Sequence, residues 1–559
     1  MSEINTNKKN KFMHDVGIIL FAQFAVKLLG LVYRMVITNI QGFGDAGNGY
    51  YTTGFQIYTL LLAISSVGIP SAISKIVSER VALKDYKGAH KIFKTAMLLF
   101  FIIGLFSSLL LYGTAGIISD YVINMPGSKY TIQSLAPSIF FVCISSVIRG
   151  YFLGLQNMKA TSNSQILEQV FKSTLTILFV IAAIGQTPEM MSAYANFATS
   201  VATILSFIYL LIFYKKNKPV FKDFNDSKDS VRDLAITKIA KNILMLSIPI
   251  SLGSIITAIN RVIDTATITR GIQIAFASCI PAYANTPAVF NPTLDQLQKE
   301  AARLAGMLGK SDTLVNMPLS LNIAFSTVLV PAISSALAIG NKKDAADKVN
   351  YSFLISTILI LPCCFGYIAL AQPIYMLIYP NASLGASLLQ LSSIAMVFIA
   401  LNQTITGSLQ GMGKVYTPAI GLLLGCIAKI TLNIILIRIP EINIYGAAIS
   451  SIVCQIISFS YCFITLCKNL TLSMNLNKYI IKPLIASVLM GVVAYGIYTV
   501  IYKLTSLNVI AIVLSMGMAV CSYGIAVLKL NILDRSEIEQ LPMGSKLASV
   551  FIKLKLLKA

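Results

Sequence analysis

Cationic side chains interrupt several apolar stretches of this sequence. Six of them fall inside segments that we predict to be membrane helices: Lys27, Arg34, Arg149, Lys172, Arg261 and Lys429. A lysine or arginine at the centre of such a helix costs about 2.5–3.5 kcal/mol on insertion scales, so it usually faces a water-filled cavity or an ionic partner. A cavity lined by cations suits an anionic substrate, above all a phosphate or diphosphate, because fixed positive charge replaces the lost hydration.

Four of these cations are the candidate substrate-binding residues: Lys27, Arg34, Arg149 and Arg261. Lys27 has no acidic residue three or four positions away and lies too deep to reach the membrane surface easily. Arg34 follows two helical turns later, on nearly the same face. Arg149 lies close enough to the inner interface for its side chain to extend to the headgroups, and this alternative stays open.

Acidic residues are scarce inside the predicted membrane helices. Glu168 lies one turn before Lys172, and Asp264 lies three residues after Arg261, so each acid either neutralises its neighbouring cation or lines a cavity with it. A cation-coupled multidrug antiporter, the alternative from another mechanism, would favour buried carboxylates without a nearby cation. The acid content therefore disfavours that alternative.

Catalytic chemistry has little support in the sequence. The chain holds 2 histidines and 9 cysteines, without CxxC or Cys/His spacing, which excludes a histidine metal site and a histidine-based triad. The loops offer no clustered acids for a metal-dependent transferase or phosphatase. We expect neither an enzyme nor a cofactor.

Composition identifies the elements that must position these cations. Only 12% of the 559 residues are charged, against about 25% in soluble proteins, while 56% are hydrophobic and the mean hydropathy is +0.76. A hydrocarbon core needs about 20 helical residues to cross. The sequence predicts an all-α polytopic membrane protein with about fourteen transmembrane helices, at 16–38, 50–74, 94–117, 130–153, 165–186, 190–213, 242–263, 312–340, 351–371, 385–410, 416–438, 443–467, 479–502 and 507–528.

The net charge of +22 carries topology information. With a cytoplasmic N-terminus, 31 of the 44 lysines and arginines fall in inner loops and tails, and 7 fall in outer loops, Lys310 among them. This asymmetry predicts a plasma-membrane protein with both termini in the cytoplasm, and it explains the charge without nucleic acid as a partner.

An internal repeat divides the chain. A shift of 257 residues aligns Gly150 with Gly407, Gly154 with Gly411 and Lys172 with Lys429. The repeat predicts two six-helix lobes related by a pseudo-twofold axis along the membrane normal, plus two C-terminal helices. The predicted parts are an N-lobe at 1–213, a cytoplasmic loop at 214–241, a C-lobe at 242–467, helices at 479–528 and a basic tail at 529–559.

Three further features follow from the pattern. The C-lobe carries an outer-side insertion at about 265–311, in which a helix opens at Thr293 with Gln296 in capping-box position. Hinges for a rocking motion, or static kinks, are expected at Gly68, Pro70, Pro249 and Pro331. The tail resembles a basic amphipathic helix, which would bind anionic membrane lipids.

Several motifs resemble one transporter family. They are KLLGLVYR from Lys27 to Arg34, GFGDAGNGYY from Gly42, GIPSAISK from Gly68 and LVNMPLSLNIAFSTVLVPAIS from Leu314. Together they are similar to the stage V sporulation protein B and MurJ-type branch of the multidrug/oligosaccharidyl-lipid/polysaccharide exporter superfamily. The resemblance covers about residues 12–530.

The resemblance implies a flippase for an undecaprenyl-diphosphate-linked sugar, with peptidoglycan lipid II as the expected substrate and a groove for the lipid tail at the last two helices. Lys27 falls at an essential basic position of MurJ-type proteins, and Arg34 fits the sporulation-type pattern. Gln56 and Thr313 stand where Gram-negative members carry cavity arginines. The alternatives are another lipid-linked polysaccharide unit or a sporulation-specific role, and cell-wall synthesis or division proteins are the expected partners.

Overall fold

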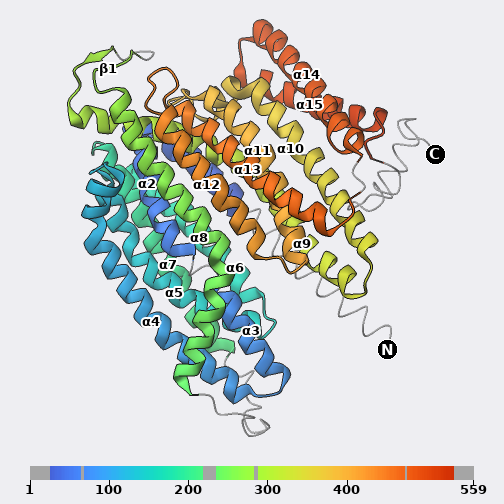
Figure 1. The fold of residues 1–559 in the computed structure, drawn as a ribbon. Coiled ribbons are helices and arrows are strands. Elements are labelled where there is room, and N and C mark those ends of the chain that lie inside the picture. Colours follow the sequence, from blue (N-terminus) through green and yellow to red (C-terminus); the bar gives the residue numbers. More distant parts are fainter. Residues whose placement is uncertain (1–25, 64–67, 218–234, 283–286, 473–474, 534–559) are drawn as a thin grey trace. The chain divides into compact units, whose positions relative to one another are not determined.

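A computed structural model describes residues 26–63, 68–217, 235–282, 287–472 and 475–533 (Figure 1). The cytoplasmic N-terminus, most of the 214–241 loop and the basic amphipathic tail, all predicted from the sequence, lie outside these residues. Nearly every described residue is helical, because the long apolar segments satisfy their backbone hydrogen bonds internally.

The first described residues form a helix over 26–38, which precedes α2. The later elements have these bounds: α2 Gly44–Ala63, α3 Ile69–Ala82, α4 Tyr86–Ile117, η2 Ile118–Ile123, α5 Ser128–Gly154, α6 Lys159–Ala182, α7 Pro188–Asn217, α8 Ile236–Ala275, β1 Cys279–Ile280, β2 Val289–Phe290, α9 Leu294–Ala338, α10 Lys342–Ile378, α11 Ala386–Gly411, α12 Tyr416–Leu436, α13 Ile444–Asn469, η4 Asn477–Ile481, α14 Lys482–Thr505 and α15 Asn508–Lys529.

Among the described residues, ten helices are long and apolar enough to cross a membrane, and the bent α8 makes an eleventh. The protein is therefore an all-α, multi-pass membrane protein. The remaining predicted spans stay predictions: 16–38 begins outside the described residues, 50–74 is divided between α2 and α3, and 312–340 forms the second half of α9.

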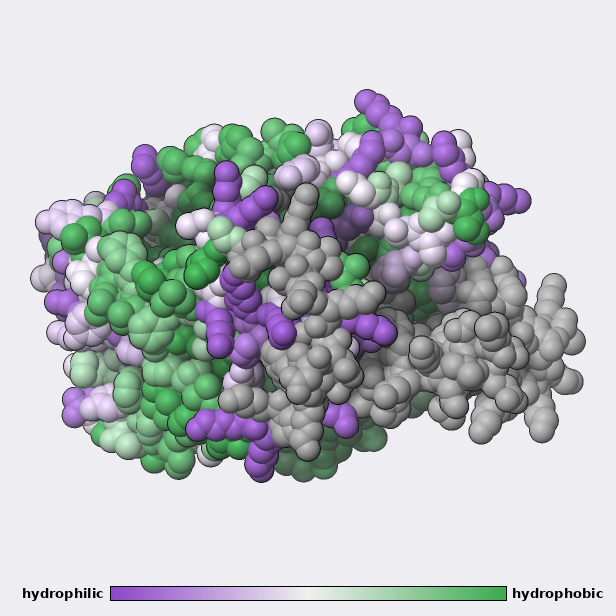
Figure 2. Space-filling view, turned by 90° about the horizontal axis from the view of Figure 1, so that it is seen from below, coloured by the Kyte–Doolittle hydropathy of each residue, from purple (hydrophilic) through white to green (hydrophobic). Residues whose placement is uncertain are grey.

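Large hydrophobic side chains are exposed on the helix surfaces, as expected for contact with lipid. Phe106, Val492 and Val520 each have about two thirds or more of their surface exposed, at 66%, 66% and 71%. Figure 2 shows hydrophobic side chains over much of one face, with hydrophilic side chains gathered beside the segments drawn in grey. A protein that exposed such a surface to water would aggregate.

The described residues form two compact units. The first comprises residues up to Gly309 together with Ile430–Ala447, and the second comprises Lys310–Lys429 together with the residues from Ala448 onward. α9, α12 and α13 contribute residues to both units. The lobes predicted from the repeat remain a prediction, because these units are defined by packing and not by sequence similarity.

The core of the first unit brings four elements together. Tyr33 and Ile37 of the helix over residues 26–38 are buried against Tyr51 of α2, Val180 of α6 and Met191 near the start of α7. Beside this core, α5 packs against α3, α4 and α7 (Figure 1). The candidate cations of the first half of the chain are therefore held on a well-packed scaffold.

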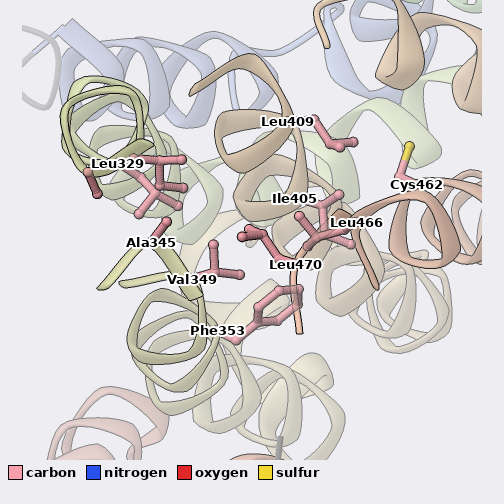
Figure 3. Close-up of a cluster of buried hydrophobic side chains, with 11 residues drawn as sticks. Leu329, Ala345, Val349, Phe353, Ile405, Leu409, Cys462, Leu466 and Leu470 are labelled. Atoms are coloured by element: carbon pink, nitrogen blue, oxygen red, sulfur yellow. The ribbon is translucent and has the colours of Figure 1, made fainter. Parts of the chain in front are cut away.

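The second unit has its own apolar core, drawn in Figure 3. Leu329 and Ile333 of α9, Val349 and Phe353 of α10, and Ile405 of α11 are buried there, and α13 contributes Cys462, Leu466 and nearby Leu470. The C-terminal helices α14 and α15 pack on each other and on α10. Burial of Met490, Ala494 and Ala519 against Leu370 fixes this contact.

The predicted outer insertion has a defined structure. After α8, β1 pairs with β2 in a short antiparallel hairpin, and α9 begins directly afterwards. The predicted capping box is confirmed: Thr293 N donates to Gln296 Oε1 at 2.8 Å, and Gln296 N donates to Thr293 Oγ1 at 3.4 Å. The sequence placed a separate piece here, whereas the helix runs without a break from Leu294 to Ala338.

Close backbone contacts join the start of α2 to the start of α9. A Cβ on Gly49 would lie 1.9 Å from Ala302 O, and a Cβ on Gly306 would lie 1.8 Å from Asp45 O. Asn48 Nδ2 also donates to Gly306 O at 2.7 Å. Only glycine permits this approach at positions 49 and 306.

Candidate functional site

Arg34 projects from the helix over residues 26–38 toward α2. Its Nη2 donates to Thr52 Oγ1 at 3.1 Å, and its Cζ lies 4.6 Å from the centroid of the Tyr51 ring. Its Nη1 is buried and has no hydrogen-bond partner among the described residues. The guanidinium is thus held in position with donor capacity left over.

Lys172 of α6 lies beside the same aromatic cluster. Its Nζ is 4.2 Å from the centroid of the Phe55 ring and 6.0 Å from that of Tyr33. The Tyr33 and Tyr51 hydroxyls are hydrogen-bonded to each other at 2.9 Å. Two cations on different helices are therefore placed around one set of rings.

Lys27 and Arg261 extend this group of cations. Both side chains are exposed, and Lys27 lies close enough to Lys172 and Arg261 to repel both electrostatically. Within the described residues, no carboxylate forms an ion pair with Lys27, Arg34, Lys172 or Arg261. We call these four residues the open cations.

Arg149 of α5 has a different environment. Its Nη2 contacts Glu168 Oε2 at 2.7 Å and Ser206 Oγ at 3.1 Å, and its Nε donates to Ser164 Oγ at 2.9 Å. The residue is 9% exposed. Glu168 thus pairs with an arginine of another helix, and the donors of Arg149 are directed to protein acceptors.

Asp264 and Gln56 belong to polar contacts of α8. Gln56 Oε1 accepts a hydrogen bond from Thr265 Oγ1, which links α2 to α8. Asn433 Nδ2 donates to Asp264 Oδ1 at 3.0 Å and to Thr267 Oγ1 at 3.1 Å. Lys429 belongs to the second unit and is buried, with 6% of its surface exposed.

The predicted hinge residues lie at tight or bent positions. α8 bends by 53° between Ile248 and Ile250, at Pro249. A Cβ on Gly68 would lie 2.0 Å from Ser251 Oγ, so the start of α3 passes very close to α8. Pro70 stands in the first turn of α3, and Pro331 lies inside α9. Their part in any motion remains a prediction.

Sequence reasoning missed the aromatic partners. Tyr51 and Phe55 are one turn apart on α2, and their rings are stacked with a centroid distance of 6.2 Å. Their spacing of four residues was the available signal, since residues at i and i+4 share a helix face.

Sequence reasoning also missed the burial of Lys310. We counted it among the outer-loop cations, which stays a prediction, and the structure places it inside α9 with 1% of its surface exposed. Its Nζ donates to the backbone oxygens of Ala382 and Leu384, and the rings of Tyr375 and Tyr379 lie 5.2 and 5.3 Å away. We call this arrangement the Lys310 cage.

The described residues contain no group of three His, Cys, Asp or Glu side chains able to hold a metal ion. What the site can do is bind anions by charge and hydrogen bonding. The open cations offer this from three helices of the first unit: the helix over residues 26–38, α6 and α8.

Comparison with known families identifies the group. The polysaccharide biosynthesis protein family matches residues 12–337. The chain belongs to this family. A second family, described as lipid II flippase MurJ, matches residues 304–523.

Individual relatives agree with this membership. The lipid II flippase MurJ of Bacillus subtilis is 25% identical over 499 residues, covering 86% of this chain and 88% of the relative. The stage V sporulation protein B of the same organism is 22% identical over 480 residues, covering 84% and 86%. The chain is thus a MurJ-like member of a family of transporters.

Solved structures support the fold. A lipid II flippase MurJ in an inward closed conformation superposes with a TM-score of 0.68 at 16% identity, covering 91% of this chain and 97% of that one. An inward-facing multidrug transporter of the MATE family gives a TM-score of 0.62 at 12% identity, covering 80% and 98%. The flippases and the MATE transporters share the architecture, so the fold alone does not select the substrate.

Proposed function

We propose that this protein is a flippase that moves an undecaprenyl-diphosphate-linked cell-wall precursor, lipid II, from the inner to the outer leaflet by alternating access. The observation that carries the proposal is the set of open cations, which have no carboxylate partner among the described residues. A diphosphate offers two adjacent anionic groups, so it can bind several cations at once.

The cations separate this proposal from drug and cation antiport. The two acids near them have other hydrogen-bond partners, since Glu168 pairs with Arg149 and Asp264 accepts from Asn433. An antiporter for cationic drugs needs acidic groups that face its substrate. Dye efflux that is lost in Glu168→Gln or Asp264→Asn would favour the antiporter instead.

A second candidate stays within the same class. The similarity to the stage V sporulation protein B favours a sporulation-specific role, with lipid II or another lipid-linked polysaccharide unit as cargo. Gln56 supports this wider choice, because the resemblance implies an arginine there in Gram-negative lipid II flippases. In either case we propose a plasma-membrane location with both termini in the cytoplasm, and contacts with cell-wall synthesis or division proteins.

The test is complementation of a bacterial strain depleted of its own lipid II flippase. We expect wild-type protein to restore growth and Lys27→Ala or Arg34→Ala to abolish it, because each change removes charge from the proposed diphosphate site. Lys299→Ala is the matched control, since this lysine is exposed and paired with Asp295. Membrane insertion is checked for every variant by fractionation.

Two outcomes would overturn the assignment. If the Lys27→Ala and Arg34→Ala strains both grew at the wild-type rate, neither residue would be needed for substrate binding. Failure of the wild-type protein to lower inner-leaflet lipid II, while another undecaprenyl-linked intermediate falls, would change the cargo.

A further inference from the structure

Lys172 and Arg34 are cations in a membrane protein that rest against aromatic rings. Lys172 faces Phe55 and Tyr33, and Arg34 faces Tyr51. No carboxylate or backbone carbonyl accepts a hydrogen bond from the Lys172 ammonium within the described residues. The groups that offset its charge are therefore the face of the Phe55 ring and the Tyr33 side chain, whose hydroxyl lies within hydrogen-bonding reach of the ammonium.

Ring faces and carboxylates offset a cation differently. A carboxylate cancels the charge and occupies the N–H donors, so little remains for a ligand. The face of an aromatic ring carries partial negative charge and attracts a cation without cancelling it. A cation held by a ring therefore keeps its full charge and can still donate hydrogen bonds.

The rings are rigidly fixed. Tyr33 and Tyr51 are 6% and 2% exposed and belong to the apolar core of the first unit. Phe55 is half-buried and packs against Tyr51 on one side and Tyr58 on the other, with centroids 6.2 and 5.6 Å apart. A cation that contacts this cluster loses freedom before any ligand arrives, which lowers the entropy cost of binding.

The hydroxyl pair of Tyr33 and Tyr51 connects the two cations. Tyr33 lies within electrostatic reach of both Lys172 and Arg34, and Tyr51 lies beneath Arg34. Displacing one tyrosine would break the 2.9 Å hydrogen bond and disturb both cations. The aromatic cluster therefore contacts both Lys172 and Arg34 and fixes their positions together.

We infer that Phe55, with Tyr33 and Tyr51, positions Lys172 and Arg34 as a pre-formed cationic receptor for the diphosphate of the lipid-linked substrate. The inference rests on the proposed function and adds residues to it: Lys172 becomes a substrate-binding group, and Phe55 becomes its positioning residue. The ring face, and not merely the volume of the side chain, is the property that matters.

The experiment replaces Phe55 by phenylalanines with one, two and three ring fluorines, introduced at a suppressed stop codon. Fluorine withdraws negative charge from the ring face while it nearly preserves shape, so packing is retained. Binding of farnesyl diphosphate to the full-length protein in detergent is measured for each variant. We expect affinity to fall stepwise, by about fivefold for the trifluoro ring, as for loss of a partly exposed cation–π contact.

Two controls make the result specific. In a Lys172→Met background, the fluorine series should have no effect on affinity, because the cation that feels the ring is gone. The same series at Phe101, which packs edge-on against Phe140 and is 47% exposed, should leave affinity at the wild-type value. A Phe55→Leu variant, which keeps an apolar side chain, should bind as weakly as the trifluoro ring.

The outcomes separate the inference from the function on which it rests. If wild-type protein binds farnesyl diphosphate and the series at Phe55 is flat, the positioning role is wrong and the proposed function stands. If wild-type protein does not bind farnesyl diphosphate, the diphosphate site itself is wrong, and the inference falls with it. A stepwise loss that persists without Lys172 would also overturn the inference.

Discussion

Lys172 in the first unit and Lys310 in the second both lie against two aromatic rings, yet their surroundings differ. Lys310 is 1% exposed and donates to two backbone carbonyls. Lys172 is partly exposed, and its hydrogen-bond partner within the described residues is the Tyr33 hydroxyl, not a carbonyl or a carboxylate. The ring contacts are common to both, so the acceptors decide the role: a lysine with its donors used holds the fold, and a lysine with donors left over can hold a ligand.

Arg149 and Arg34 repeat this contrast with a guanidinium. Arg149 directs its donors to Ser164, Glu168 and Ser206, whereas Arg34 keeps a buried nitrogen without a partner. The comparison therefore predicts that loss of stability and loss of substrate binding belong to different cations.

The largest effect on stability is expected from Arg149→Met. Removing one partner of a buried ion pair typically costs about 3–5 kcal/mol of unfolding free energy, and the lower end applies here because Glu168 is partly exposed. Unfolding of the purified protein by SDS measures this loss. The double variant Arg149→Met with Glu168→Gln should recover part of it, because the isolated carboxylate is then gone. If the Arg149→Met protein were as stable as wild type but no longer bound farnesyl diphosphate, Arg149 would be a substrate-binding residue like the open cations.

A smaller loss is expected from Lys310→Met. The change leaves the carbonyls of Ala382 and Leu384 without this donor, and a buried unsatisfied polar group costs about 1–3 kcal/mol. The same unfolding assay compares it with Lys172→Met, which should retain wild-type stability and lose farnesyl diphosphate affinity. Reversal of the two phenotypes would show that acceptors do not distinguish the two lysines.

The smallest effect is expected at Lys299, which forms an exposed pair with Asp295 one turn away at 2.7 Å. Lys299→Ala should change the unfolding free energy by at most about 0.5 kcal/mol. The hydrogen bond to Asp295 raises the pKa of Lys299 above its ordinary value of 10.5 in the folded protein. The pair's contribution to stability is therefore fully present below pH 10.5 and is lost as the pH rises through the raised pKa. Unfolding curves from pH 7 to 9 should therefore show no change from this pair, and a marked pH effect would contradict it.

The sequence was sufficient to predict the fold class. Long apolar runs predict membrane helices whatever their packing, since the bilayer imposes the length. The capping box at Thr293 and Gln296 was also predictable, because it depends on residues only three positions apart. Local rules of this kind do not require knowledge of the neighbouring helices.

The partners of the cations could not be predicted in the same way. Glu168 has Lys172 one turn away, but its ion pair is with Arg149, 19 positions earlier in the chain. The burial of Lys310 was not predicted, because apolar spacing does not reveal that a chain segment near Ala382 covers it. Such contacts depend on which helices lie side by side, and a single sequence taken alone carries no signal for them.

The ring beneath Lys172 also has an optical consequence. The sequence contains 28 phenylalanines and no tryptophan, so Phe55→Trp would give the protein a single indole fluorophore in direct contact with the ammonium group. An indole binds a cation more strongly than a phenyl ring does, so the variant should retain the geometry of the site. Emission from this one residue would then report, in real time and without a labelled lipid, each arrival and departure of negative charge at Lys172.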